Sequence, residues 1–538
     1  MSYTFLDVKA DSVGDNFRDN VQKIYLPPKD GHGTRLLETK EDGTYHYVKF
    51  FDAMYGAGQK KAPFADALEE YCRQRMIPFH TPGHKLGTGA PVREQLLFGK
   101  ALRQDLGLMY ALDDLFQPEG PLREAMELAA DAYGAGRTFF SVNGTTACIE
   151  AMILAVCGPG DTVLIPREAH RSVLSGLILS GAVPAYMESR YAEREEVSLG
   201  PDPTSLQAAI AAHKDARAVL FTYPTYDGLA GQLTEMVRIA HQYGLIVLVD
   251  EAHGAHLAFH EELPPDALAC GADCVAQSTH KLTGSLTQTS MLHCRRGFPY
   301  TDRVAAAMAL VQSTSPHYWF LASLDLARQQ MALEGRQRET QALSLARQAR
   351  KQLNALPGIS CFGREMMRYE AVGNLDETKL TIDFSGLGLM GREAERLLRD
   401  ARIEVELTAG HHVLALVTFG DSDKSIQALL DGCRKIAGTH QVVERKDTLE
   451  PPLPQPQVVM APREAWYAEK ETISRSLCAG RICAETITFY PPGIPVVAAG
   501  EVLTGDVLAY IDQKLAAGYV TNGAADSSLD TIQVVRKG

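Results

Sequence analysis

The stretch LTEMVRIAHQYGLIVLVDEAHG (residues 233–254) places a helix-length segment directly before a strand-length apolar run. The run LIVLV is continuously apolar and ends at Asp250. A continuous apolar run of this length is typical of a strand that is buried on both faces, as in a parallel sheet covered by helices. The stretch therefore predicts an α/β fold.

The same alternation extends from Arg137 to Leu292. Four further apolar runs are separated by helix-length segments: TFFSV (138–142), TVLIP (162–166), AVLFTYP (218–224) and CVAQS (274–278). Strands that alternate with helices indicate a mostly parallel sheet with helices on both faces. Ligands of such sheets bind at the carboxyl ends of the strands.

The rest of the chain predicts further domains, because 538 residues exceed what one core usually holds. The predicted ranges are an N-terminal arm that docks on the body or on a neighbouring subunit (1–75), a large domain (76–300), a helical connection interrupted only by Pro316 (301–356), a smaller α/β domain (357–445) and a C-terminal domain that begins with a proline-rich connection (446–538).

The composition of the chain limits the kinds of molecule that the protein can bind. The chain has 53 basic and 66 acidic residues, and its net charge of −13 disfavours nucleic acid and anionic membranes. It contains no 18-residue apolar stretch and does not begin like a signal peptide. Its ten cysteines include no Cys-x-x-Cys pair, which is typical of buried thiols in a reducing compartment. We expect a cytoplasmic protein that acts on a small molecule.

The first candidate site follows the run TFFSV, where Asn143, Gly144, Thr145 and Thr146 precede a helical segment. Backbone amides at a helix start, with two hydroxyls beside them, can bind a phosphate without a lysine. The alternative is that Thr145 or Thr146 only caps the helix.

The second candidate is Asp250, at the end of the run LIVLV. A carboxylate at the end of a buried strand needs a cationic or hydrogen-bonding partner. It could bind a metal, act as a base or pair with a protonated ring nitrogen. His253, His256 and His260 favour a metal, but the glycine and loop character of this segment disfavour it. We expect no metal site.

The third candidate is Lys281, which follows the run CVAQS among small hydroxyl residues and His280. A lysine at the mouth of a parallel sheet is a candidate Schiff-base amine, because burial lowers its pKa. A phosphate cradle, a carboxylate and an amine are together what pyridoxal phosphate requires of a protein.

The chain resembles the Orn/Lys/Arg decarboxylase family of fold-type I pyridoxal-phosphate enzymes, in the short branch without the amino-terminal wing domain. The stretches that carry this resemblance are PFHTPGHKLG (78–87), DDLFQPEGPLREAMELAADAYGAGRTFFSVNGTT (113–146), REAHRSV (167–173), YPTYDG (223–228), DEAHGAH (250–256), QSTHKLTGSLTQTS (277–290), QSTSPHYWFLASLD (312–325) and YPPGIP (490–495). The resemblance implies an aspartate-aminotransferase-like large domain, a smaller α/β domain and a C-terminal α+β domain.

The resemblance also implies roles for single residues. Lys281 would hold the cofactor as a Schiff base, with His280 before it as a phosphate or proton-transfer contact. Asp250 would pair with the ring nitrogen. The remaining implied contacts to the cofactor are the phosphate-binding residues Gly144, Thr145, Thr146 and Ser278, His170 on the ring face, His253 at the ring edge, and Ser313 and Thr314 reaching the partner subunit's phosphate.

The implied reaction is decarboxylation of a basic L-amino acid to agmatine or a diamine, with arginine or lysine preferred to ornithine. Glu485 is a candidate acceptor for the substrate's side-chain cation, and an exposed strand-end carboxylate is the alternative. The implied assembly is a homodimer with shared active sites, or a higher homo-oligomer. An aminotransferase on the same fold and a catalytically silent homologue are the competing hypotheses.

Overall fold

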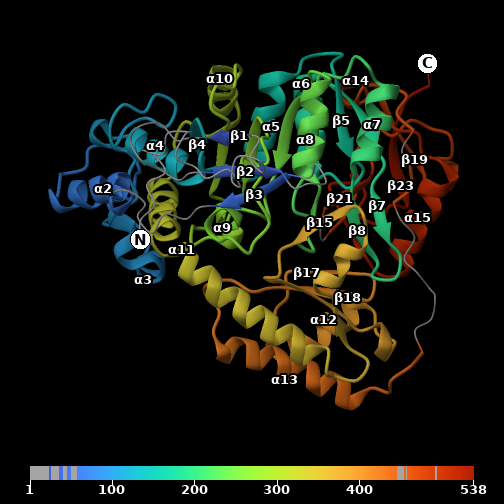
Figure 1. The fold of residues 1–538 in the computed structure, drawn as a ribbon. Helices are drawn as coiled ribbons and strands as arrows, with labels where there is room; N and C mark the ends of the chain where they lie inside the picture. Colours follow the sequence, from blue (N-terminus) through green and yellow to red (C-terminus); the bar gives the residue numbers. More distant parts are fainter. Residues whose placement is uncertain are drawn as a thin grey trace. The chain divides into compact units, whose positions relative to one another are not determined.

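The structure of the protein is a computed structural model (Figure 1). It describes residues 57–444, 453–455, 457–490 and 493–537, together with three short strands nearer the N-terminus. Most of the predicted N-terminal arm therefore lies outside the described residues. The chain divides into two units, with residues 1–155 and 249–337 in unit 1 and residues 156–248 and 338–538 in unit 2.

Unit 1 contains a sheet in which β13 lies between β4 and β12. The strands are β4 (Arg137–Ser141), β12 (Cys274–Gln277) and β13 (Ser290–Cys294). β13 is antiparallel to both neighbours, so β4 and β12 run in the same direction and end at the same edge. The end of β11 (Ile246–Asp250) lies beside β12, because Glu251 N–H donates to the Ala276 carbonyl at 2.9 Å.

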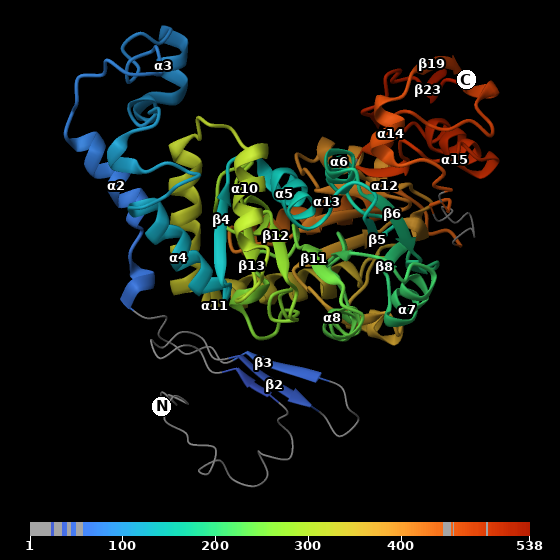
Figure 2. The same cartoon turned by 90° about the horizontal axis from the view of Figure 1, so that it is seen from above.

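Helices α4 and α10 of unit 1 pack against β4 (Figure 2). On α4, Leu122, Met126, Ala129 and Tyr133 form a buried face at helical spacing. The helices of unit 1 are α2 (Pro63–Arg73), α3 (Val92–Phe98), α4 (Pro121–Tyr133), α5 (Gly144–Val156), α9 (Thr279–Leu282), α10 (Thr301–Val311) and the first part of α11 (Tyr318–Leu353). The N-terminal strands β1 (Lys23–Tyr25), β2 (Arg35–Thr39) and β3 (Tyr45–Lys49) form an antiparallel sheet.

Unit 2 begins with a parallel sheet in the order β9-β5-β6. Its strands are almost fully buried, as their apolar sequences predict. The elements of this part are β5 (Thr162–Pro166), α6 (Arg171–Ser180), β6 (Val183–Met187), β7 (Arg190–Ala192), β8 (Val197–Gly200), α7 (Pro203–Ala212), β9 (Ala218–Thr222), β10 (Leu229–Gly231) and α8 (Leu233–Gln242).

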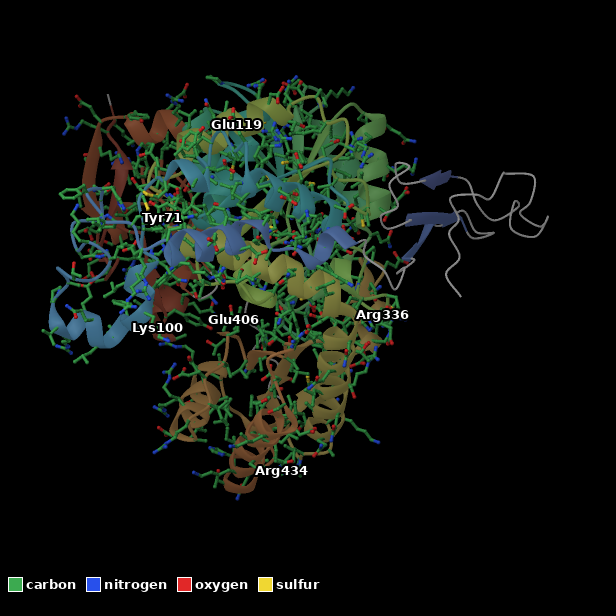
Figure 3. The ribbon with its side chains drawn as sticks, turned by 90° about the vertical axis from the view of Figure 1, so that its left-hand side faces the viewer. Tyr71, Lys100, Glu119, Arg336, Glu406 and Arg434 are labelled. Atoms are coloured by element: carbon green, nitrogen blue, oxygen red, sulfur yellow. The ribbon has the colours of Figure 1, made fainter. Side chains whose placement is uncertain are left out.

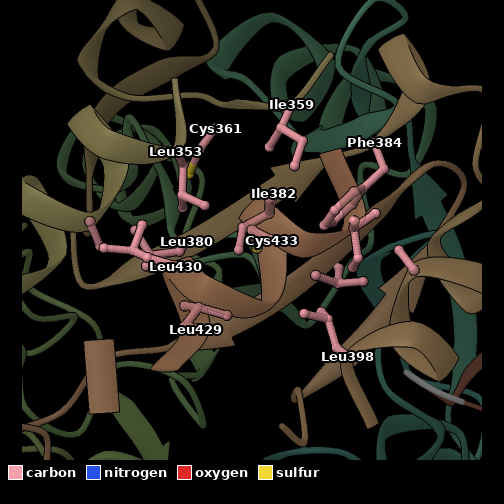
Figure 4. Close-up of a cluster of buried hydrophobic side chains, with 14 of the residues drawn as sticks. Leu353, Ile359, Cys361, Leu380, Ile382, Phe384, Leu398, Leu429, Leu430 and Cys433 are labelled. Carbon is pink, nitrogen blue, oxygen red and sulfur yellow. The ribbon is translucent and has the colours of Figure 1, made fainter. Parts of the chain in front are cut away.

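A second, antiparallel sheet of unit 2 has the order β14-β16-β18-β17. Figure 4 shows its core, in which Leu380 and Ile382 of β16 pack with Leu398, Leu430 and Cys433 from two helices. The elements are the second part of α11, β14 (Ser360–Cys361), β15 (Val372–Leu375), β16 (Lys379–Asp383), α12 (Gly391–Asp400), β17 (Leu407–Ala409), β18 (His412–Leu416) and α13 (Asp423–Thr439).

The C-terminal part of unit 2 has its own buried apolar cluster, which includes Ile487, Val497, Leu503, Ile511 and Ile532. Two small antiparallel sheets surround it, in the orders β19-β23 and β21-β20-β22. The elements are α14 (Pro462–Tyr467), β19 (Lys470–Ser474), β20 (Ile487–Tyr490), β21 (Ile494–Val497), α15 (Gly505–Ala516), β22 (Val520–Asn522) and β23 (Thr531–Val535).

The predicted α/β fold with a mostly parallel central sheet is confirmed, and each of the five apolar runs contains a strand. The helical connection consists of α10 and α11, and Pro316 lies in the break between them. β6 and β13 were not predicted, because Pro184 and the polar residues of SMLHC interrupt the apolar pattern. Within the described residues, no helix has the length and apolar character needed to cross a membrane.

Candidate active site

The turn between β4 and α5 carries a cluster of buried hydroxyl groups. The Oγ1 atom of Thr145 lies 2.5 Å from Ser278 Oγ and 2.6 Å from Ser290 Oγ. Gly144 begins α5 with a φ of +74°, which glycine adopts without a Cβ clash. Hydroxyls beside the first amides of a helix can bind a phosphate. Thr146, the next residue, is exposed.

Asp250 ends β11 with a side chain that is almost fully buried. The backbone N–H of Ala252 donates to its Oδ1 atom at 3.1 Å. Burial raises the pKa of Asp250 to about 6, although the Ala252 hydrogen bond and the positive charge of Lys281 both lower it. A cation against this carboxylate offsets the free energy that burial of its charge costs.

Lys281 lies on the short helix α9, directly after β12. Its Nζ atom is 2.9 Å from Nε2 of His253, a buried residue in the loop after β11. An ammonium group donates hydrogen bonds, and a neutral imidazole nitrogen accepts them. His253 is therefore placed to accept the proton that Lys281 must lose before its amine acts as a nucleophile.

His280 precedes Lys281 on α9, and its ring is oriented by the backbone. Its Nδ1 atom donates to the Thr289 carbonyl at 2.7 Å, and the Thr279 hydroxyl donates to the same carbonyl at 3.2 Å. With Nδ1 as the donor, Nε2 is the ring atom that exchanges protons. This geometry suits a proton-transfer residue.

A chain of hydrogen bonds between buried polar side chains was not predicted from the sequence. The Glu251 carboxylate accepts from the Ala267 N–H and from Nε2 of Gln277, both at 2.7 Å. Oε1 of Gln277 accepts from Nε2 of His293 at 3.0 Å, and Nδ1 of His293 accepts from the Thr138 hydroxyl at 2.8 Å. These bonds connect the ends of β11 and β12 with β13 and β4. They fix β11, which ends at Asp250, and β12, which α9 with Lys281 follows.

Ser290 was also missed. Its hydroxyl donates to the Gln277 carbonyl at 2.5 Å and contacts Thr145. Because Ser290 lies in a strand that was not predicted, the direction of its side chain could not be predicted either. Only the hydroxyl run in QTSMLHC could have pointed to it.

Other predicted residues form different contacts. Ser313 and Thr314 are exposed in the loop between α10 and α11, and Ser313 N–H lies 3.5 Å from Asn143 Oδ1. His170 belongs to unit 2, where its Nδ1 atom accepts from the hydroxyl of Ser172 at the start of α6.

Glu485 also belongs to unit 2, and its carboxylate is buried. It accepts from the backbone N–H groups of Ala525 at 2.6 Å and Gln533 at 2.7 Å. Both oxygens are therefore engaged in stabilising the C-terminal segment. The alternative of an exposed strand-end carboxylate does not describe this environment.

The profile of the Orn/Lys/Arg decarboxylase major domain matches residues 62–425, and that of the C-terminal domain matches residues 446–518. The chain belongs to the Orn/Lys/Arg decarboxylase family. The predicted class of enzyme, an amino acid decarboxylase that uses pyridoxal phosphate, is thereby confirmed.

Individual members of the family differ in their similarity to this decarboxylase. It is 42% identical to the arginine decarboxylase of Bacillus subtilis, over 89% of this chain and 99% of that protein. It is 28% identical to the lysine decarboxylase LdcA of Pseudomonas aeruginosa, over 84% of this chain and 75% of that protein. The constitutive lysine decarboxylase structure from Escherichia coli has a TM-score of 0.74 at 22% identity and covers 89% of this chain and 82% of its own, which supports the same fold.

The donor groups of unit 1 fit the cofactor of this family. Pyridoxal phosphate presents a phosphate, a basic ring nitrogen and an aldehyde. The Thr145, Ser278 and Ser290 hydroxyls suit the phosphate, the Asp250 carboxylate suits a protonated nitrogen, and the Lys281 amine suits the aldehyde. All of these residues belong to unit 1.

Replacing Thr145 with valine removes the hydroxyl between Ser278 and Ser290 and preserves the shape of the side chain. We expect the dissociation constant for pyridoxal phosphate to rise about 10-fold to 100-fold, because a hydrogen bond to a charged group is lost. Thr145→Ser is the matched control and should bind nearly as tightly as the wild type. Fluorescence titration of the apoenzyme measures both, and wild-type affinity in Thr145→Val would contradict the phosphate role.

Replacing Asp250 with asparagine should stabilise the apoenzyme and impair catalysis. The fold raises the pKa of Asp250 from 3.8 to about 6, so stability is lost as the pH rises through this interval. At pH 8 we expect the free energy of unfolding of the Asp250→Asn apoenzyme to exceed that of the wild type by up to about 3 kcal/mol. Near pH 4 the two free energies should become equal. Denaturant unfolding and turnover measure the two effects. A variant that is less stable at pH 8 would contradict the assigned cost of burial.

Proposed function

We propose that this enzyme converts L-arginine into agmatine and CO₂. The observation that carries this proposal is the difference between its relatives. Proteins named arginine decarboxylase are 39–42% identical to it and match over 97–99% of their own length. Proteins named lysine decarboxylase are 25–28% identical and match over 75–77% of theirs. Substrate preference is expected to follow the nearer group.

The roles of the site residues follow from their chemistry. When bound, pyridoxal phosphate supplies an electron sink for the bond between Cα and the carboxylate of the substrate. Lys281 holds the aldehyde carbon of the cofactor, and His253 accepts the proton from its amine. Asp250 keeps the ring nitrogen protonated. His170 covers the ring face.

Other residues bind the phosphate and donate the proton to Cα. The phosphate is bound by Gly144, Thr145, Thr146 and Ser278, and the Ser290 hydroxyl assists them. His280 or Lys281 delivers a proton to Cα after CO₂ leaves. The backbone carbonyl that fixes His280 Nδ1 directs the proton exchange to Nε2.

We also propose that the enzyme is a homodimer with shared active sites. Residues 76–110 of unit 1 carry an exposed apolar surface, in which Ile77, Phe79, Leu96 and Tyr110 are each at least 80% exposed. Figure 3 faces this side of the chain, with Tyr71 and Lys100 labelled. An apolar surface of this kind marks an interface. A second copy would cover it, with Ser313 and Thr314 of each subunit reaching the other's phosphate.

We also propose that the protein is cytoplasmic and that it binds neither nucleic acid nor membranes. The net charge of −13 disfavours polyanions. All ten cysteines are free thiols, and nine of them are buried. Free thiols are typical of proteins in a reducing compartment.

The test is to incubate the holoenzyme separately with L-arginine, L-lysine and L-ornithine and to follow CO₂ and the amine product. We expect agmatine to form with a kcat/KM at least about 100-fold above that for lysine, because a site built for one polar group discriminates strongly against another. Lys281→Ala should show no turnover, whereas Lys214→Ala, which changes an exposed lysine, should match the wild type.

The alternatives give different products. Preferred turnover of lysine or ornithine would contradict the substrate and leave the family assignment intact. Amino-group transfer to an oxo acid without CO₂ would indicate the aminotransferase, and a cofactor-loaded protein without turnover would indicate the silent homologue.

A further inference from the structure

The loop between α10 and α11 presents a short row of hydroxyl groups on the surface of unit 1. It consists of residues 312–317, and Ser313, Thr314 and Ser315 are exposed. The Ser315 N–H donates to Ser313 Oγ at 3.2 Å. In the proposed homodimer, Ser313 and Thr314 reach the phosphate of the partner's cofactor. The position of this loop therefore determines how well they bind it.

The first end of the loop is fastened to the end of β4. Oε1 of Gln312 accepts from the Val142 N–H at 2.8 Å, and Nε2 of Gln312 donates to the Phe140 carbonyl at 3.4 Å. Nδ2 of Asn143 donates to the Val311 carbonyl at 3.5 Å. These bonds hold the end of α10 beside the turn that begins α5.

Asp105 lies between two imidazole rings at the other end of the loop. Its Oδ2 atom is 2.9 Å from Nε2 of His84, and its Oδ1 atom is 3.7 Å from Nε2 of His317. The Gly87 N–H donates to His84 Nδ1 at 3.0 Å, and the Trp319 N–H donates to His317 Nδ1 at 3.3 Å. Because a ring nitrogen that accepts a hydrogen bond carries no proton, Nε2 carries the proton in both rings. Each ring therefore presents an N–H group to the carboxylate.

The three side chains are partly shielded from solvent. Their exposed fractions are 15% for His84, 30% for Asp105 and 36% for His317. The contact of Asp105 with His317 is electrostatic, because 3.7 Å is longer than a hydrogen bond, and partial burial strengthens it. The His317 ring also stacks on Phe320, with ring centroids 5.2 Å apart and 29° between the planes. The orientation of His317 is thus set from two sides.

The cluster connects segments that are far apart in the sequence. His84 belongs to the stretch PFHTPGHKLG (78–87), and His317 belongs to QSTSPHYWFLASLD (312–325). Both stretches carry the family resemblance, whereas Asp105 lies in none of the stretches that do. All three residues belong to unit 1. Asp105 is therefore the link between the first stretch and the hydroxyl loop.

We propose that Asp105 is a positioning residue of the cofactor site, which holds the hydroxyls of Ser313 and Thr314 in place through His317. This inference rests on the proposed homodimer with shared active sites. A loop that is already fixed in its binding conformation loses less entropy when it binds a phosphate. Asp105 acts in this way without contacting the phosphate itself.

A double-mutant cycle tests this role through the dissociation constant of pyridoxal phosphate, measured by fluorescence titration of the dimeric apoenzyme. Asp105→Asn keeps the size of the side chain but has one acceptor oxygen, so it cannot accept from both imidazoles. We expect the dissociation constant to rise about 3-fold to 10-fold. The variant Ser313→Ala/Thr314→Val should raise it about 10-fold to 100-fold. Adding Asp105→Asn to that variant should raise it no further.

Asp302→Asn is the matched control, because it changes an exposed carboxylate on α10 of the same unit. Its dissociation constant for pyridoxal phosphate should equal that of the wild type. Sedimentation of each variant checks that the protein remains dimeric at the concentration of the titration.

The outcomes separate this inference from the proposed function. A monomeric wild type, or wild-type affinity in Ser313→Ala/Thr314→Val, contradicts the proposed shared site and overturns this inference with it. Weakened binding in that variant, together with wild-type affinity in Asp105→Asn, overturns the role of Asp105 alone. An equal effect of Asp105→Asn with and without the two hydroxyls also overturns it, because a merely structural change would act on both.

A second variant keeps the inference testable if Asp105→Asn does not fold. His317→Asn retains a side-chain oxygen that can accept from the Trp319 N–H at the start of α11, but it is too short to reach Asp105. It must raise the dissociation constant for pyridoxal phosphate only when the hydroxyls of Ser313 and Thr314 are present. The same rise in their absence would overturn the inference.

Discussion

The buried charge of Asp250 is the constraint on which the rest of the site depends. Its carboxylate lies at the end of a strand whose neighbouring residues are apolar and buried. One backbone N–H and the charge of Lys281 offset only part of the free energy that burial of this charge costs, so the pKa of Asp250 stays near 6. In the proposed function, the cation that completes the site is the protonated ring of the cofactor.

The surrounding structure keeps this charge and the reactive amine in fixed positions. The chain from Glu251 through Gln277 and His293 to Thr138 gives each of these four buried side chains a hydrogen-bond partner. A network in which each member has a partner limits the motion of the strand ends. Asp250 ends one of these strands, and Lys281 lies on the short helix that follows another.

The sequence predicts the parts of this structure that depend on local pattern. Strands such as β5 and β11 can be identified because both of their faces are buried. Thr145, Asp250 and Lys281 can be grouped because each follows such a strand, and the contact between Thr145 and Ser278 agrees with that grouping. The resemblance to the family then adds His253, whose contact with Lys281 the structure displays.

The remaining features depend on contacts between distant segments. Ser290 and His293 interrupt an apolar pattern, and their meaning comes only from the strands on either side of β13. The partners of Glu485 lie 40 and 48 residues away, so its local sequence cannot reveal that two amides hold it.

The most direct test of the account is to identify the lysine that carries the cofactor. The holoenzyme is reduced with borohydride and digested, and the peptide with the added pyridoxyl group is located by mass spectrometry. The account predicts modification at Lys281. Modification at any other lysine, with Lys281 unlabelled, would contradict it.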